Sequence, residues 1–126
     1  MDRADAAVAA ARDRYTDVAS RLRVRRLDFA DPTEAATPPE RSFDLVTMRL
    51  VPAFLPDKAA VAELVRRLHA PGGVWPVTTP LTGRLPEERR SIGLTPEDVP
   101  TVTGRWNRGH WYDLEPGGLR CFVLRD

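Results

Sequence analysis

The sequence contains one cysteine, Cys121, and one lysine, Lys58, among its 126 residues. A single cysteine excludes a disulfide within the chain, and a free thiol suits the reducing cytoplasm. No apolar run approaches the roughly 20 residues that a membrane-spanning helix needs, and the acidic start of the chain does not resemble a signal peptide. We therefore expect a cytoplasmic protein with no membrane partner.

Strong charge of either sign is also lacking. The formal net charge is +1, which gives no general attraction for nucleic acid or for an acidic membrane. The arginines between residues 21 and 26 are interpreted as a solvated cluster. No spacing of histidine, cysteine and carboxylate residues is typical of a metal site. We expect neither a nucleic-acid partner nor a bound metal.

What is present is an ordinary globular composition, 42% hydrophobic and 29% charged, over a length that suits a single domain of residues 1–126. Apolar spacing predicts a helix over residues 6–19, with Asp5 as its N-terminal cap. A short strand is predicted over Leu22–Leu27, and the proline-containing segment 28–42 is predicted to be a loop.

The strongest strand candidate is Phe43–Val51, whose nearly continuous apolar run is typical of a parallel strand buried on both faces. Asp57 is placed to cap a helix over residues 58–69, which Pro71-Gly72-Gly73 ends. A further strand is predicted over residues 74–79. This alternation of helices and strands predicts an α/β fold with crossover connections and a parallel sheet.

The last third of the chain has a different pattern. A short helix is predicted to begin at Thr95-Pro96-Glu97-Asp98. Two strand-like runs, residues 106–114 and 119–124, flank the Gly/Pro-containing segment 115–118. Their spacing predicts an antiparallel hairpin.

Three segments together resemble the class I S-adenosylmethionine-dependent methyltransferases. They are Phe43-Asp44-Leu45-Val46, the helix after it, and the arginine–leucine segment that leads through Pro71-Gly72-Gly73 into the next strand. In that family these are the fourth strand, its helix and the fifth strand, and the hairpin resembles strands six and seven. The resemblance implies a Rossmann-like methyltransferase fold, here N-terminally truncated, with a mostly parallel sheet, a C-terminal antiparallel hairpin and the strand order 3-2-1-4-5-7-6.

The resemblance also implies a cofactor, S-adenosylmethionine, and residues that bind it. Asp2 would accept hydrogen bonds from the ribose hydroxyls, and Asp28 with Phe29 would contact the adenine. Met48 and Arg49, which leave the fourth strand, would lie near the sulfonium. Since the methyl group is already activated, alignment with an acceptor is the main requirement, so no particular catalytic residue is predicted. A small-molecule acceptor is expected.

Each of these positions also has a plainer interpretation. Asp2 is close to the terminus and would then be a solvated residue. Asp28 would cap a turn, and Arg49 would be a paired surface arginine. His110 lies among aromatic residues, so it either lines an acceptor pocket or packs within the hairpin, which is the commoner role.

One family feature is absent from the sequence, the loop of type G-x-G-x-G after the first strand. A misplaced start or a truncated gene would explain its absence. The alternative function is therefore a non-catalytic fragment or partner-binding remnant, and a second rival is another Rossmann-type binder such as a nucleotide-dependent oxidoreductase. With its neighbours missing, Phe43–Val51 is expected to form an exposed edge, which Leu22–Leu27 would cover or through which the chain would self-associate.

Overall fold

The computed structural model describes residues 4–18, 21–25, 28, 39–114 and 118–126. The chain divides into two compact units, residues 1–38 and 39–126, and each is described by itself. Among the described residues, no helix is both long enough and apolar enough to cross a membrane.

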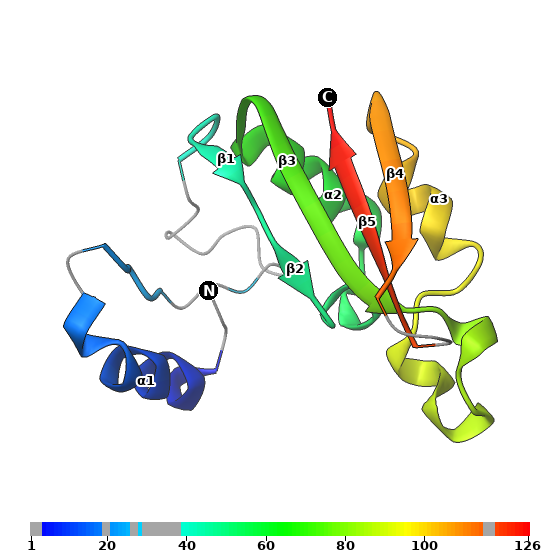
Figure 1. Ribbon diagram of the computed structural model, residues 1–126, viewed down its shortest axis with the longest axis horizontal. Coiled ribbons are helices and arrows are strands. Elements are labelled where there is room, and N and C mark those ends of the chain that lie inside the picture. The colour runs from blue at the N-terminus through cyan, green and yellow to red at the C-terminus, as the bar shows by residue number, and fades with distance from the viewer. Residues whose placement is uncertain (1–3, 19–20, 26–27, 29–38, 115–117) are drawn as a thin grey trace. The chain divides into compact units, whose positions relative to one another are not determined.

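The N-terminal unit contains helix α1, Asp5–Arg14, and a 3₁₀ turn, η1, Thr16–Val18 (Figure 1). The predicted helix is confirmed in its first two-thirds, but Asp5 lies in its first turn and Ala4 occupies the cap position. Residues 22–25 form no strand, so the predicted strand is wrong for them; residues 26–27 lie outside the described residues. Only Val24 is partly buried there, and so little apolar surface gives a strand small gain from packing.

The C-terminal unit is a sheet with the order β1-β3-β5-β4, in which β2 also pairs with β3 (Figure 1). The strands are β1 Phe43–Leu45, β2 Met48–Arg49, β3 His69–Pro80, β4 Arg108–Asp113 and β5 Leu119–Arg125. This order agrees with the 4-5-7-6 part of the expected arrangement, and the antiparallel hairpin is confirmed.

The expectation of a mostly parallel sheet is wrong. The sheet is mixed: β1 and β2 pair with β3 in parallel, whereas the longer pairings, β3 with β5 and β5 with β4, are antiparallel. The antiparallel ladder between β3 and β5 runs without a shift from the pair Val74–Arg125 to the pair Pro80–Leu119. The two antiparallel pairings of β5 therefore form most of the sheet's hydrogen-bonded length.

The predicted strand Phe43–Val51 is two short strands, and it is not buried on both faces. Leu45 is 57% exposed. Between Phe43 and Leu45 the register with β3 shifts, from His69 to Val74. The shift spans Pro71 and Gly72, and Gly72 has φ +80. A left-handed residue beside a proline cannot continue a regular ladder, so β1 loses its partner there.

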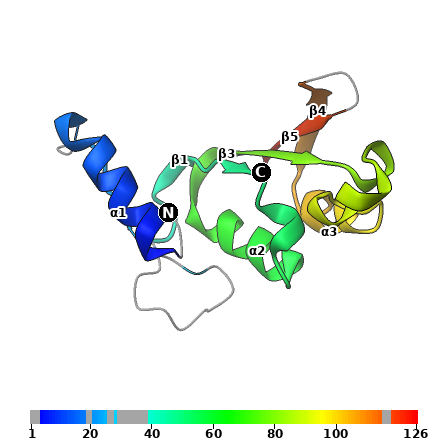
Figure 2. The same ribbon diagram turned by 90° about the horizontal axis from the view of Figure 1, so that it is seen from below.

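Two helices cover one side of this sheet (Figure 2). They are α2, Lys58–Leu68, and α3, Asp98–Thr103; short 3₁₀ turns lie at Pro52–Phe54 (η2), Thr82–Arg84 (η3) and Glu87–Ile92 (η4). The predicted cap of α2 is confirmed, because Asp57 Oδ1 accepts a hydrogen bond from the Ala60 N–H at 2.8 Å. The predicted short helix is confirmed too; it begins at Asp98, the last residue of the predicted start, whose N–H donates to Thr95 Oγ1.

The core lies between these helices and the sheet. On β3 the alternate residues Trp75, Val77 and Thr79 are buried, as are Phe122 and Leu124 on β5. Trp75 pairs with Leu124 and Val77 with Phe122, which places these four on one face. From α2 the core receives four side chains with helical spacing: Val61, Ala62, Val65 and Leu68.

Candidate functional site at the carboxyl ends of the parallel strands

The parallel strands β2 and β3 end side by side. Met48 pairs with Val77 and Arg49 with Thr78. Met48 is buried on the face that α2 covers, whereas Arg49 is exposed. In open α/β sheets, ligands bind in the crevice outside the carboxyl ends of the strands, so this edge is the candidate site.

Leu50 turns the chain away from the sheet at this edge. Its N–H donates to the Thr78 carbonyl at 2.8 Å, and its φ is 58. A left-handed conformation costs a residue with a Cβ on the order of 1–2 kcal/mol. The hydrogen bond to β3 holds Leu50 there, and strained backbone of this kind is concentrated at functional sites.

Leu50, Val51 and Phe54, which we call the apolar rim, project large side chains into solvent at this turn. Phe54, on η2, is 64% exposed, and the other two are more than 40% exposed. Neighbouring exposed apolar side chains at a strand end are typical of a surface that a ligand or another segment covers. An apolar rim beside an arginine offers both packing area and a positive charge.

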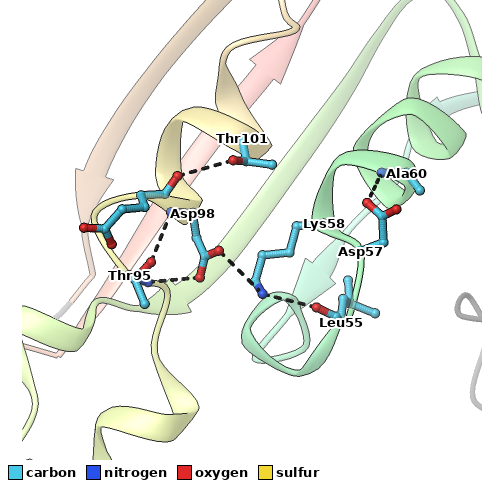
Figure 3. A network of polar contacts seen from close by, with 8 residues as sticks. Leu55, Asp57, Lys58, Ala60, Thr95, Asp98 and Thr101 are labelled. Atoms are coloured by element: carbon cyan, nitrogen blue, oxygen red, sulfur yellow. Dashed lines mark hydrogen bonds and ion pairs between the residues drawn. The ribbon is translucent and has the colours of Figure 1, made fainter.

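A polar network holds the segment that follows the rim (Figure 3). Lys58 Nζ donates to the Leu55 carbonyl at 3.1 Å and lies 3.6 Å from Asp98 Oδ1. Asp98 Oδ2 in turn accepts from the Thr95 N–H at 3.3 Å. The start of α2, the end of η2 and the start of α3 are therefore tied to one partly buried ammonium group.

Sequence reasoning did not single out Lys58. A usable signal existed, because Lys58 is the sequence's only lysine and follows a helix cap. Its partner Asp98 lies 40 positions later in the chain, and only the packing of α3 beside α2 brings the two together.

Of the predicted cofactor-binding residues, the structure places Met48 and Arg49 at this edge. Met48 is only 6% exposed, so its side chain packs in the core. Asp28 is partly buried in the N-terminal unit. Asp2 and Phe29 lie outside the described residues. The assignments of all five residues stay predictions.

A hollow lies at the opposite end of β3. This cavity of about 520 Å³ is lined by the end of α2 and the start of β3, with three arginines and three carboxylates. Arg66 bonds to both oxygens of Asp126, and Arg67 pairs with Glu40, so these charges largely satisfy one another. It is therefore a poorer candidate for the site than the rim.

His69, expected to end α2, is instead the first residue of β3 and is buried beside this cavity. Burial lowers the pKa of His69. A weak contact with the main chain of Val74 opposes that shift in part, but neither ring nitrogen has a hydrogen bond of good geometry. The ring lies edge-on to Trp106, with centroids 5.4 Å apart. A Cβ on residue 73 would lie 2.9 Å from the ring, so Gly73 permits this packing.

Among the described residues, no group of three or more histidine, cysteine or acidic side chains is placed to hold a metal ion. No family model and no curated protein matches the chain in sequence. Solved structures do match it in fold.

The CMeT domain of the citrinin polyketide synthase has a TM-score of 0.74 and 14% identity, covering 98% of this chain and 37% of its own. A SAM-dependent methyltransferase from Aquifex aeolicus has a TM-score of 0.70 and 12% identity, covering 98% and 65%. A possible exported protein from Bordetella parapertussis has a TM-score of 0.69 and 15% identity, covering 98% and 51%.

The chain has the α/β fold of these three structures. At such identities the likeness establishes the fold alone. The chain also spans less than two thirds of the length of each of the three structures.

Proposed function

We propose that this chain is part of a methyltransferase that uses S-adenosylmethionine to methylate a small-molecule acceptor. The observation that carries the proposal is the fold likeness to the Aquifex aeolicus SAM-dependent methyltransferase over 98% of the chain. The sheet order around β3, with the hairpin on one side and β1 and β2 on the other, supports it.

The carboxyl edge of β2 supplies suitable groups for this chemistry. A methyl group on a sulfonium needs an acceptor aligned with the S–CH₃ bond and the exclusion of water. We propose that the apolar rim excludes water from the acceptor and that the main chain of Met48 and Arg49 lies near the sulfonium. The Lys58 network keeps the rim's segment in place by fixing Leu55.

The cofactor site would be incomplete within these residues, because the sequence has no G-x-G-x-G loop. We expect the 126-residue chain to bind S-adenosylmethionine weakly or not at all. Isothermal titration calorimetry checks this. A dissociation constant in the low micromolar range, about −8 kcal/mol, would contradict the incomplete site.

A longer form tests the function itself. If the upstream DNA encodes, in frame, a strand followed by G-x-G-x-G, the extended protein should bind S-adenosylmethionine. Asp2→Ala and Asp28→Ala should each weaken that binding by about 1.5–3 kcal/mol, since each removes a charged hydrogen-bond acceptor.

Asp44→Ala is the matched control, because Asp44 is exposed on β1 and carries no proposed contact. Unchanged affinity in both test variants would remove the ribose and adenine assignments. An upstream stop codon, with no binding by the chain, would favour a non-catalytic remnant.

We also propose that the edge formed by β1 and β2 is a surface for self-association, since Leu45 and Leu50 are exposed along it. Sedimentation velocity at increasing concentration should show a larger species. Leu45→Lys should reduce that species, because a charge on an edge strand opposes pairing. A chain that stays monomeric at all concentrations would contradict this edge as an interface.

A further inference from the structure

A separate hollow of about 410 Å³ lies where α3 meets the hairpin strands β4 and β5. Val99 of α3 and Phe122 and Leu124 of β5 line it with apolar side chains. Phe122 and Leu124 belong to the core. The volume is in the range of small-molecule sites, roughly 300–1,000 Å³. None of its lining residues belongs to the apolar rim.

Trp111 and Arg120 form one wall of this hollow. The Arg120 guanidinium carbon lies 3.4 Å from the centroid of the Trp111 ring, a close cation–π stack. Trp111 remains 54% exposed, although tryptophan is the largest side chain available to the core. Because Arg120 stacks on Trp111, the indole ring stays at the surface and forms an aromatic wall for a ligand bound in the hollow.

The orientation of Arg120 is fixed by Asp113. Arg120 Nε donates to Asp113 Oδ1 at 2.9 Å and its Nη2 donates to Oδ2 at 3.4 Å. Arg84 Nη1 also reaches Asp113 Oδ2, at 2.8 Å. Two guanidinium groups share one carboxylate, so the cluster carries an excess positive charge. Within the described part of the chain, Arg120 Nη1 makes no hydrogen bond.

Gly109 keeps the hollow open. It lines the hollow on β4, directly opposite Leu124 in the sheet. A Cβ at position 109 would lie 3.0 Å from Leu124 Cδ2, so any side chain there would occupy the space above the apolar floor.

We propose that this hollow binds a small planar carboxylate, such as an aromatic acid. The ring would lie on Phe122, Leu124 and Val99, and the carboxylate would accept hydrogen bonds from Arg120 Nη1. Guanidinium and carboxylate groups are planar and match in geometry. An apolar floor with one fixed cation at its edge selects a ligand that is flat, apolar and singly anionic.

The test uses 2-naphthoate and its neutral isostere 2-naphthamide as probes on the 126-residue chain. Calorimetry should show naphthoate binding at least about tenfold more tightly than the amide, a difference of about 1.4 kcal/mol. In ¹⁵N spectra, the amide signals of Gly109 and Arg120 should shift on addition of naphthoate, while those of Leu50 and Phe54 at the rim should not.

Arg120→Met and Arg84→Met form a matched pair. Each removes one arginine from Asp113, but only Arg120 lines the hollow. Arg120→Met should lower naphthoate affinity to that of the amide, while Arg84→Met should leave the preference for naphthoate intact. Gly109→Val should block both probes without loss of folded structure by circular dichroism.

Three results would overturn the proposal. They are equal affinity for the two probes, equal loss of naphthoate binding in the two arginine variants, and no saturable binding by the wild-type chain at roughly 10 mM probe, a free energy of only about −3 kcal/mol. None of these results bears on methyl transfer, because the proposal uses no residue of the rim.

Discussion

The two halves of the sheet meet at β3 and differ in almost every respect. On one side β1 and β2 are short, interrupted by a register shift and bordered by exposed leucines. On the other side β5 pairs with β3 without a shift, and β4 pairs with β5 over its whole length. Both halves share β3. The difference therefore arises from the strands that pair with β3 on each side and from the part of β3 that each of them lies opposite.

The comparison shows that an apolar run does not make a long strand by itself. Phe43–Val51 is more continuously apolar than the hairpin, yet it is the more exposed of the two. The hairpin closes through a short connection, which costs little chain entropy. The 43–51 segment is separated from β3 in the chain by α2. At its start it lies opposite Pro71 and Gly72, where the register with β3 shifts and regular backbone pairing is lost.

The largest expected effect is on stability, and a matched pair of substitutions measures it. Leu124→Ala should lower the free energy of unfolding by about 2–5 kcal/mol, because Leu124 is 2% exposed in the antiparallel half. Leu45→Ala removes the same atoms from the parallel half and should change it by no more than about 0.5 kcal/mol. Urea denaturation followed by circular dichroism gives both values. Equal losses would mean that the two halves are equally packed in solution.

Hydrogen exchange sharpens the comparison residue by residue. Val77 and Val123 lie on strands with a neighbour on each side, so their amides should exchange slowest. Val46, whose N–H donates to the Val74 carbonyl between β1 and β2, should exchange at least about tenfold faster, or about 1.4 kcal/mol lower in opening free energy. Amides of α1 should exchange fast, since Val8 is its only buried side chain.

Strong protection from residue 6 onward in a monomer would contradict this pattern. It would mean that the parallel half is completed in solution by contacts with the N-terminal unit. The same spectra, recorded on the Leu45→Lys variant, separate protection within one chain from protection by a second copy.

The same two halves of the sheet differ in how far local sequence determines their structure. The hairpin, the Asp57 cap of α2 and a short helix opened by the segment Thr95–Asp98 were all predicted correctly, because each depends on residues within a few positions of one another. The register shift at the start of Phe43–Val51 was missed because it lies opposite Pro71 and Gly72, about 25 residues later in the β3 backbone, and propensity carries no information on such a partner.

The candidate site was predictable only in part for the same reason. Met48 and Arg49 are implied by the resemblance to the fourth strand of the methyltransferases. The left-handed Leu50 and the Lys58–Asp98 contact depend on where β3 and α3 lie. A pattern of residue types gives the strand end, but the side chains that support it come from distant segments that only packing brings together.

Acid should weaken the two halves at different pH values. His69 pairs with Phe43 in the parallel half, and its folded-state pKa is lowered below the ordinary 6.5 because burial disfavours the charged ring. Above pH 6.5 His69 is neutral in both the folded and the unfolded chain, and its contribution to stability is complete. Below pH 6.5 the unfolded chain takes up the proton before the folded chain does, so the free energy of unfolding decreases. The melting temperature should therefore begin to fall below pH 6.5, and His69→Gln should remove that early fall.

The smallest effect is expected in the antiparallel half, at lower pH. Hydrogen bonds from Arg120 and then Arg84 lower the pKa of Asp113 from 3.8 to about 2. A lowered carboxyl pKa gives stability that is complete above pH 3.8 and is lost as the pH falls through about 2. Asp113 is open to solvent, so water and salt screen the interaction and the change in melting temperature should be slight. Melting curves between pH 5 and pH 2 should show a steeper decline for the wild type than for Asp113→Asn, which keeps the shape but cannot titrate. Parallel declines would mean that the arginine pair does not hold Asp113 in solution, and the fixed orientation of Arg120 beside the hollow would lose its support.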